Sequence, residues 1–221
     1  MLYNNLEVAV PTSVPARRAS RAAGQQTRSA LLHAATELFV SDGDAVPLSR
    51  ICAQAGAHPN QVTYYFGSKE ALFVEVACAA VLRAGRHAEE AALRADTVRA
   101  YTHALVATLF DREVDGVRLF VEAMLLAGRR PEHQPAIDAA LGTLYAAGER
   151  ALMDTLVRTG WELRAHAAIE ARAFWSAVFG VVVQKHATAG AIGTSLEDAV
   201  TVVFTSLQIP ESVLDAPVPH A

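Results

Sequence analysis

The chain has 221 residues, of which 52% are hydrophobic, so it can hold a small domain fused to a larger one with an ample buried core. Its formal net charge of -4 excludes a histone-like polycation but allows a local basic surface. Two isolated cysteines, Cys52 and Cys78, without a CxxC pair indicate a reducing cytoplasm. No signal-peptide pattern is present and the longest apolar stretch, residues 179–183, is too short for a bilayer, so we expect neither export nor a membrane partner.

Residues 1–25 combine prolines, serines and a glycine with no sustained helical period, so we expect a flexible arm. No acidic residue stands between Glu7 and Glu37, which leaves this segment basic. Such an arm points to an anionic partner, although a solvated disordered tail has the same composition. The residues of the arm that would contact such a partner are Arg17, Arg18 and Arg21.

Two helices are predicted directly after the arm. Apolar residues recur at i, i+3, i+4 and i+7 over residues 31–39, which predicts a helix that begins near Thr27 and ends at residues 41–43. Pro47 suits the first turn of a second helix, because the N–H that proline lacks would be unpaired there. Gly56 then ends this helix.

A third and a fourth helix follow at once. Pro59 opens a short helix that ends at Gly67, and Ser68 resembles the N-cap of the next helix, with an acid in its first turn. The second and third helices, joined by a tight turn at Gly56, form a helix-turn-helix. The turn needs a residue that tolerates positive φ, and the second of the two helices enters the DNA major groove.

The remainder is predicted to be helical, because no strand-like alternation or hairpin turn is present. Ser195 caps a last helix that Pro210 ends. The fold class expected is therefore all-α. Helix breaks are expected near residues 95–96, 111–116, 129–133, 160 and 190–194.

The segment ICAQAGAHPNQVTYYFGSKEALF, residues 51–73, resembles the N-terminal signature of TetR-family repressors. Its most specific part is YYFxSKExLF, residues 64–73. The first helix is also similar, with AxxLF at residues 35–39 and the following Gly43. The close resemblance covers residues 27–76, and beyond it only the helical pattern and the total length fit.

This resemblance implies that the third helix is the recognition helix. Asn60 and Gln61 can pair with N6 and N7 of adenine, and Lys69 at a helix start can hold a phosphate. Tyr65 suits core packing and a phosphate contact equally. Outside the arm, the candidate DNA-contacting residues are Ser49, Arg50, His58, Asn60, Gln61, Thr63, Tyr64, Tyr65 and Lys69.

Two positions depart from the family's pattern. Many members carry a tyrosine where this chain has Thr63, and a serine or threonine cap where it has Pro47. Tyr64 and the arm are the substitutes available for those phosphate contacts. Phe66, like the apolar residues of the first helix, is expected in the core.

The resemblance divides the chain into an arm (1–25), a three-helix helix-turn-helix domain (26–73), a helical ligand-binding and dimerisation domain (74–210) and a tail (211–221). Apolar bulk with scattered polar groups favours a hydrophobic or aromatic effector over a nucleotide. Aromatic and methionine residues at helical spacing are more often core than cavity. The candidate ligand-binding residues are Tyr101, His103, Phe110, Phe120, Met124, Tyr145, Met153, Phe174 and Gln184.

The family's last two long helices form a four-helix bundle with a second subunit. In this chain they are expected at residues 165–189 and 195–207. A homodimer places two recognition helices about 34 Å apart on double-stranded DNA, which predicts a roughly palindromic operator. The candidate interface residues are Trp175, Phe179, Val182, Val183, Val200, Val203 and Phe204.

An enzyme is not expected, because the chain has no GxSxG elbow, no phosphate loop and no GxGxxG after a strand. No HExxH motif or i, i+4 histidine pair is present, so we expect no metal and no cofactor. The function expected is a DNA-binding repressor released by a small, largely apolar effector. A helical scaffold or adaptor, a constitutive DNA binder and an activator remain alternatives.

Overall fold

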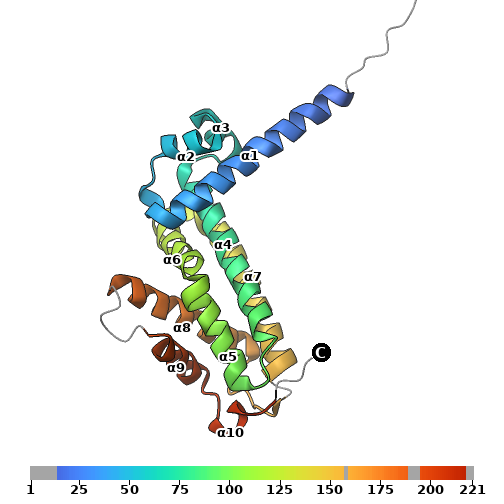
Figure 1. The fold of residues 1–221 in the computed structure, drawn as a ribbon, viewed down its shortest axis with the longest axis vertical. Coiled ribbons are helices and arrows are strands. Elements are labelled where there is room, and N and C mark those ends of the chain that lie inside the picture. Colours follow the sequence, from blue (N-terminus) through green and yellow to red (C-terminus); the bar gives the residue numbers. More distant parts are fainter. Residues whose placement is uncertain (1–13, 157–158, 189–194, 218–221) are drawn as a thin grey trace, which may run out of the picture.

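The computed structural model describes residues 14–156, 159–188 and 195–217, and in these ranges the chain consists of helices without a β-strand. The molecule is elongated, with a small N-terminal unit at one end and a larger helical bundle at the other (Figure 1). A long helix, α4 (Lys69–Ala92), runs from the first unit into the second. The predicted all-α architecture is confirmed.

The N-terminal unit is a three-helix cluster completed by the first turns of α4. Its helices are α1 (Val14–Asp42), α2 (Leu48–Ala55) and α3 (Pro59–Phe66), with a short 3₁₀ turn (Gly43–Ala45) after α1. Phe39 of α1 and Phe73 of α4 are buried, and their rings meet edge to face with centroids 5.0 Å apart. This aromatic contact fixes α4 against the rest of the N-terminal unit.

Helix α1 begins at Val14, well before the predicted start near Thr27. Residues 14–25 therefore belong to a helix and not to a flexible arm, while the rest of the predicted arm lies outside the described residues. A proline in the first turn, here Pro15, is compatible with this start because it removes no intrahelical hydrogen bond. The N-terminal half of α1 projects beyond α2 and α3 (Figure 1).

Gly56 and Ser68 cap helices of this unit as the sequence predicts. Gly56 has φ 61° in the left-handed region and ends α2, while Pro47 is the N-cap of α2 rather than a first-turn residue. Ser68 Oγ accepts a hydrogen bond from the backbone N–H of Ala71 at 3.0 Å. A hydrogen bond from its own backbone N–H lowers the pKa of the Glu70 carboxyl in the first turn of α4.

The larger bundle is built around the C-terminal part of α4. Its short non-α segments are two π-helical stretches, Thr108–Arg112 and Leu152–Leu156, and a 3₁₀ turn, Pro131–His133. The α-helices are α5 (Val98–Ala107), α6 (Val114–Arg129), α7 (Gln134–Ala151), α8 (Ala167–Ala187), α9 (Leu196–Leu207) and α10 (Glu211–Leu214).

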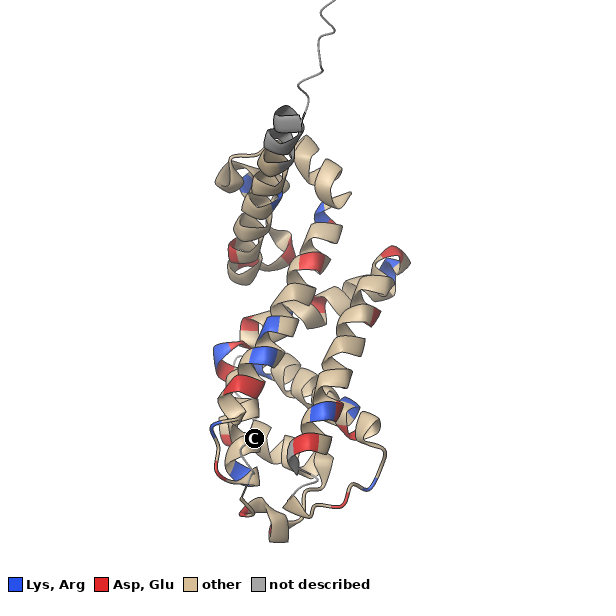
Figure 2. Ribbon diagram, turned by 90° about the vertical axis from the view of Figure 1, so that its right-hand side faces the viewer, with Lys and Arg blue, Asp and Glu red and all other residues tan. Residues whose placement is uncertain are grey.

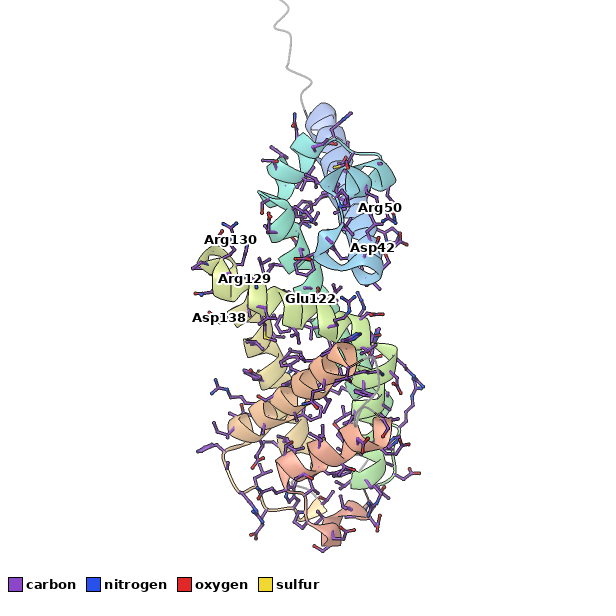
Figure 3. The ribbon with its side chains drawn as sticks, turned by 90° about the vertical axis from the view of Figure 1, so that its left-hand side faces the viewer. Asp42, Arg50, Glu122, Arg129, Arg130 and Asp138 are labelled. Atoms are coloured by element: carbon purple, nitrogen blue, oxygen red, sulfur yellow. The ribbon has the colours of Figure 1, made fainter. Side chains whose placement is uncertain are left out.

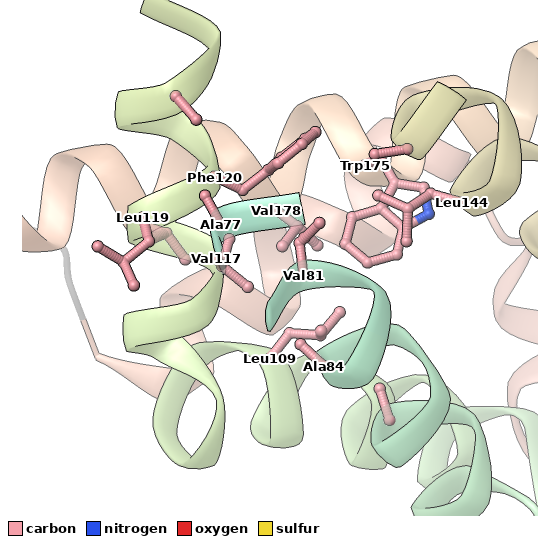
Figure 4. Close-up of a cluster of buried hydrophobic side chains, with 14 of the residues drawn as sticks. Ala77, Val81, Ala84, Leu109, Val117, Leu119, Phe120, Leu144, Trp175 and Val178 are labelled. Atoms are coloured by element: carbon pink, nitrogen blue, oxygen red, sulfur yellow. The ribbon is translucent and has the colours of Figure 1, made fainter. Parts of the chain in front are cut away.

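The core of the bundle forms where α4, α6 and α8 meet (Figure 4). Val81 of α4 is fully buried there. The ring of Phe120 on α6 lies 5.8 Å from that of Phe179 on α8, which lies 5.5 Å from the ring of Trp175. The contact between Phe120 and Phe179 packs α8 against α6.

The predicted tail, residues 211–221, is packed as far as it is described. Leu214 of α10 is buried, and the backbone N–H of Val98 donates to the carbonyl of Ala216 at 3.2 Å. The Arg99 guanidinium lies 3.1 Å from the Asp215 carboxylate. The chain after α9 therefore folds back onto the start of α5 rather than extending into solvent.

Candidate DNA-binding site and ligand cavity

Helix α3 has one buried face and one exposed polar face. Val62 is fully buried in the core of the N-terminal unit. Asn60, Thr63 and Tyr64 are exposed, and their i, i+3, i+4 spacing places them on one side of the helix. Tyr64 is 81% exposed, which is unusual for a tyrosine without a binding partner. This face has the size and the polar groups that major-groove readout requires.

The start of α3 uses two of the predicted DNA-contacting residues for its own capping. The backbone N–H of His58, the N-cap, donates to the side-chain oxygen of Gln61 at 2.8 Å. Bidentate pairing of Gln61 with adenine would need this same oxygen, so the predicted base contact competes with the cap. Asn60 is exposed next to it and is the better candidate for adenine.

Replacing Gln61 by Ala is expected to lower the free energy of unfolding by roughly 0.5–2 kcal/mol, because the N-terminal turn of α3 loses its capping hydrogen bond. Urea denaturation followed by circular dichroism measures the change. The matched control is Asn60→Ala, which alters an exposed side chain and should change stability by at most about 0.5 kcal/mol. Equal stability of the two variants would contradict this role.

Charged residues around the helix-turn-helix are engaged in local contacts but stay accessible. Arg50 lies 2.5 Å from the Asp42 carboxylate, and Figure 3 shows the pair on the outside of the unit. The Lys69 ammonium donates to the backbone carbonyl of Asp44. Ser49 is exposed beside Arg50. An exposed ion pair is weak, so these groups can exchange their partners for DNA phosphates.

Arg28 is a structural residue that the sequence reasoning missed. Its guanidinium binds both carboxylate oxygens of Glu75 on α4, at 2.5 and 2.7 Å, and lies 4.9 Å from the centre of the Phe66 ring on α3. Because one guanidinium nitrogen, Nη2, donates to both oxygens and the guanidinium lies over the Phe66 ring, Arg28 links α1 to α4 and α3. In the sequence, the one indication of this role was the position of Arg28 near the end of a segment without acidic residues.

Tyr65 packs inside the unit rather than facing the same side as Tyr64. It is partly buried against the core, and its ring meets that of Tyr64 edge to face at 4.9 Å. A Cβ placed on Gly24 of α1 would lie 3.2 Å from the Tyr65 hydroxyl. Of the two roles that the sequence left open, the geometry favours packing between α3 and α1.

The three arginines of the predicted arm stand on the N-terminal half of α1. This first part of α1 has no acidic residue in its first turn and extends past α2 and α3 (Figure 1). The side chains themselves lie outside the described residues. Their positions on the chain are Arg17, Arg18 and Arg21.

A cavity of about 380 Å³ lies between α4, α5, α7 and α8, and its size matches small-molecule sites. Tyr101 and Phe174 line it, as the sequence predicted. Trp175, predicted for the dimer interface, lines it as well. Gly148 lets α7 approach α8 closely beside the cavity, because a Cβ there would lie 3.1 Å from the Ala171 Cβ.

The other candidate ligand-binding residues do not line this cavity. Phe110 and Phe120 are buried in the core, and the Lys185 ammonium lies 3.9 Å from the centre of the Phe110 ring. Correct helix assignment did not fix which side of each helix faces the cavity, because several sides are apolar. Met124 and Tyr145 are partly buried elsewhere, and the exposed residues are His103, Met153 and Gln184.

The predicted dimer interface also needs correction. Val182 and Val203 are fully buried within one protomer, and Trp175 and Val200 nearly so, hence none of them has much surface left for a second subunit. Phe179 and Phe204 are partly buried. Val183 alone among the candidates is markedly exposed, at 45%.

The exposed apolar residues of α8 and α9, of which Val183 alone was predicted for the interface, are taken together as an outer apolar face. We define it by Ile169, Val183 and Val202, which are 51%, 45% and 45% exposed. Among the described residues, α8 is the one helix long and apolar enough to span a membrane. Since its inner face is packed in the protomer, its overall apolarity reflects two apolar faces, the pattern of a helix covered on both sides.

The two units are joined through Arg118 of α6. Its guanidinium donates to the backbone carbonyl of Val40 in the last turn of α1 at 2.9 Å, and to Glu122 at 2.7 Å. A cation at a helix C-terminus is favourable because the carbonyl ends carry partial negative charge. Figure 3 shows Glu122 on α6 directly beside the N-terminal unit. Arg118 thus connects the cavity-bearing bundle to the helix-turn-helix.

The two thiols are poor nucleophiles. Burial, with a smaller effect of Glu75, raises the pKa of Cys78 to about 11, and burial raises the pKa of Cys52. Both thiols therefore stay protonated at neutral pH, and the thiolate is the reactive form. Within the described ranges, no three potential metal ligands gather in one place.

A helix-turn-helix with an exposed polar recognition face, carried on a helical bundle with an apolar cavity, defines a ligand-binding class of DNA-binding regulator. A family model described as "Bacterial regulatory proteins, tetR family" matches residues 31–76, and one described as "Bacterial transcriptional repressor C-terminal" matches residues 98–204. The chain belongs to the TetR family of bacterial transcriptional regulators.

Solved structures agree with this assignment. A transcriptional regulator from a Rhodococcus species is 58% identical, with a TM-score of 0.81 over 85% of this chain and 98% of that chain. A TetR-family regulator from Mesorhizobium loti is 20% identical, with a TM-score of 0.61 over 84% of this chain and 95% of that chain. SmeT, the repressor of a Stenotrophomonas maltophilia multidrug efflux pump, is 22% identical, with a TM-score of 0.56 over 86% of this chain and 96% of that chain. The comparison with curated proteins gave no match.

Proposed function

We propose that the chain is a sequence-specific repressor that binds a roughly palindromic operator as a homodimer and leaves it when a small, largely apolar molecule fills the cavity. The observation that carries the DNA-binding part is the exposed face of α3, with Tyr64 81% exposed beside Asn60 and Thr63. The regulator acts in the cytoplasm, where DNA is accessible, and performs no catalysis.

The proposed DNA contacts are of two kinds, contacts with base edges and contacts with phosphates. Asn60 reads a base edge, and Tyr64 and Thr63 donate to phosphate oxygens or base edges. Arg50 and Lys69 are cations at the rim of this face and bind phosphates in place of their present carboxylate and carbonyl partners. The arginines on the projecting part of α1 add non-specific affinity.

Release of DNA follows from a shift between two conformers. An effector that binds better to the conformer with misplaced recognition helices moves the population away from the DNA-binding one. The cavity lies against α4, which begins directly after the helix-turn-helix. Arg118 provides a second connection, through the carbonyl of Val40. A coupling free energy of about 1–3 kcal/mol is typical of such systems.

Replacing Arg118 by Ala is expected to weaken the effect of the effector on operator affinity by roughly 0.5–2 kcal/mol, because one of the two connections between the units is lost. The measurement is the operator dissociation constant with and without a saturating cavity ligand. Arg129→Ala, at the free end of the same helix, is the matched control. An unchanged ratio of the two dissociation constants would exclude Arg118 from the coupling.

Selection of bound sequences from a random pool of double-stranded DNA, at physiological salt, tests the proposed function. The expected result is one enriched site with two inverted half-sites about one helical turn apart. Loss of this enrichment in Asn60→Ala would assign the readout to α3. Binding without any sequence enrichment would instead support the scaffold interpretation, since salt-sensitive non-specific affinity needs only the basic groups.

A further inference from the structure

The cavity has an uneven distribution of polarity. Its inner lining is buried and largely apolar, with Leu144 and Trp175 among the residues least exposed to solvent. The lining residues that are exposed are Arg86 on α4 and Thr143 and Arg150 on α7. Because α4 and α7 pack against each other, these exposed residues mark the mouth of the cavity between the two helices.

The mouth carries a net positive charge. Arg86 and Arg150 contribute two cations, and the half-buried Glu89 is the one acid among the cavity-lining residues. Neither arginine forms an ion pair with another residue of the described ranges. Two other acids of the bundle, Glu113 and Asp111, are engaged by His87 and Lys185, and Figure 2 shows both basic and acidic residues along the bundle. Two arginines at the edge of a largely apolar cavity are therefore available to bind an anion, and guanidinium groups match carboxylates in geometry.

The volume limits the apolar part of the ligand. At about 30 Å³ for each water-sized group, a cavity of about 380 Å³ accepts on the order of a dozen non-hydrogen atoms. The Trp175 and Phe174 rings meet edge to face at 5.6 Å and form a rigid aromatic wall. A straight alkyl chain or a single aryl group with a short chain fits these limits.

We infer that the cavity takes an amphiphilic monocarboxylate of about this size, with its apolar body against Trp175 and its carboxylate at Arg86 and Arg150. This inference rests on the proposed function, since it names the chemical class of the effector. A carboxylate is ionised at neutral pH and stays at the mouth, where water and both arginines reach it. The apolar body supplies affinity by leaving water, and the arginines discriminate between anionic, neutral and cationic analogues.

The test measures direct binding of small probe molecules to the DNA-free protein, with tryptophan fluorescence as the readout. Trp175 lines the cavity and the second tryptophan, Trp161, does not, so Trp161→Phe isolates the signal. The probes are decanoate, decan-1-ol and decan-1-amine, with 4-phenylbutanoate to separate alkyl from aryl occupants. Decanoate or 4-phenylbutanoate should bind at least about tenfold more tightly than the alcohol and the amine.

Variants assign the carboxylate to the mouth. Arg86→Gln and Arg150→Gln should each weaken carboxylate binding about fivefold or more and leave decan-1-ol binding within about twofold. Arg94→Gln removes the same charge from an exposed arginine outside the cavity and should change neither. Equal binding of the three decyl probes, tighter binding of the amine, or carboxylate binding unaffected by both variants would overturn the inference.

Measuring operator affinity in the presence of the same probes separates this inference from the proposed function. Carboxylate binding that depends on Arg86 and Arg150 but leaves operator affinity unchanged would contradict the proposed release of DNA and support the ligand class. Operator release by neutral or cationic probes alone would support the release mechanism and contradict the ligand class.

Discussion

Replacing Asn60 by Ala is expected to lower affinity for the selected operator between about 30-fold and about 20,000-fold. One base-reading amide is worth roughly 1–3 kcal/mol, and a two-fold symmetric dimer loses two of them. Each 1.4 kcal/mol corresponds to a factor of about ten in the dissociation constant. Fluorescence anisotropy with a labelled operator at fixed salt measures the loss.

The controls for Asn60→Ala depend on the absence of a charge on the asparagine side chain. Asn60 is uncharged, so the slope of log affinity against log salt should stay the same and affinity for random DNA should be unchanged. Arg50→Ala should instead weaken binding to both DNAs and lower that slope by about 0.9 per phosphate contact. An equal loss on operator and random DNA in Asn60→Ala would place base readout elsewhere.

Local structure in the DNA-binding unit was predictable because it depends on short-range chemistry. Gly56 is at positive φ where the turn requires it, and Ser68 and Ser195 accept hydrogen bonds from backbone N–H groups three residues later. Each of these positions is determined by two or three neighbours in the sequence. The family motif overlaps them, so the fold of this unit followed from residues 27–76.

The described part of the predicted arm, residues 14–25, is helical and not flexible, because two features of the sequence conflicted. Prolines and a glycine indicated flexibility, whereas residues 16–23 are mostly alanine and arginine, both strong helix formers. In the structure residues 14–25 are helical, and Gly24 of α1 lies close to the Tyr65 hydroxyl. Whether that contact would form was not readable from the sequence, since it joins α1 to α3.

The cavity and the dimer face were not predictable in detail, because α8 is apolar nearly all around. Periodicity identifies an amphipathic helix by contrast between faces, and here the contrast is absent. Val182 and Val183 are adjacent and chemically identical, yet one is fully buried and the other 45% exposed. Small residues that let two helices approach beside the cavity, such as Gly148, carry no signal until their neighbours in space are known.

Substitutions at the neighbouring residues Val182 and Val183 provide the sharpest test of the dimer interface. Val183→Asp places a carboxylate on the outer apolar face, where two symmetry-related charges would be buried without partners in a homodimer, at a cost of several kcal/mol. The variant should remain folded but elute as a monomer in size-exclusion chromatography with light scattering. Because a monomer engages one half-site, operator affinity should fall at least about a hundredfold.

Val182→Asp is the matched variant, and it separates dimerisation from folding. Val182 is fully buried inside the protomer, so a carboxylate there should destabilise the fold itself by roughly 3–5 kcal/mol, seen as a lower midpoint of thermal unfolding. If the outer face of α8 and α9 were ordinary surface, Val183→Asp would stay in the native oligomeric state with full operator affinity. Val202→Asp on α9 should behave like Val183→Asp, because Val202 shares the outer face, and agreement between the two places both helices in the interface.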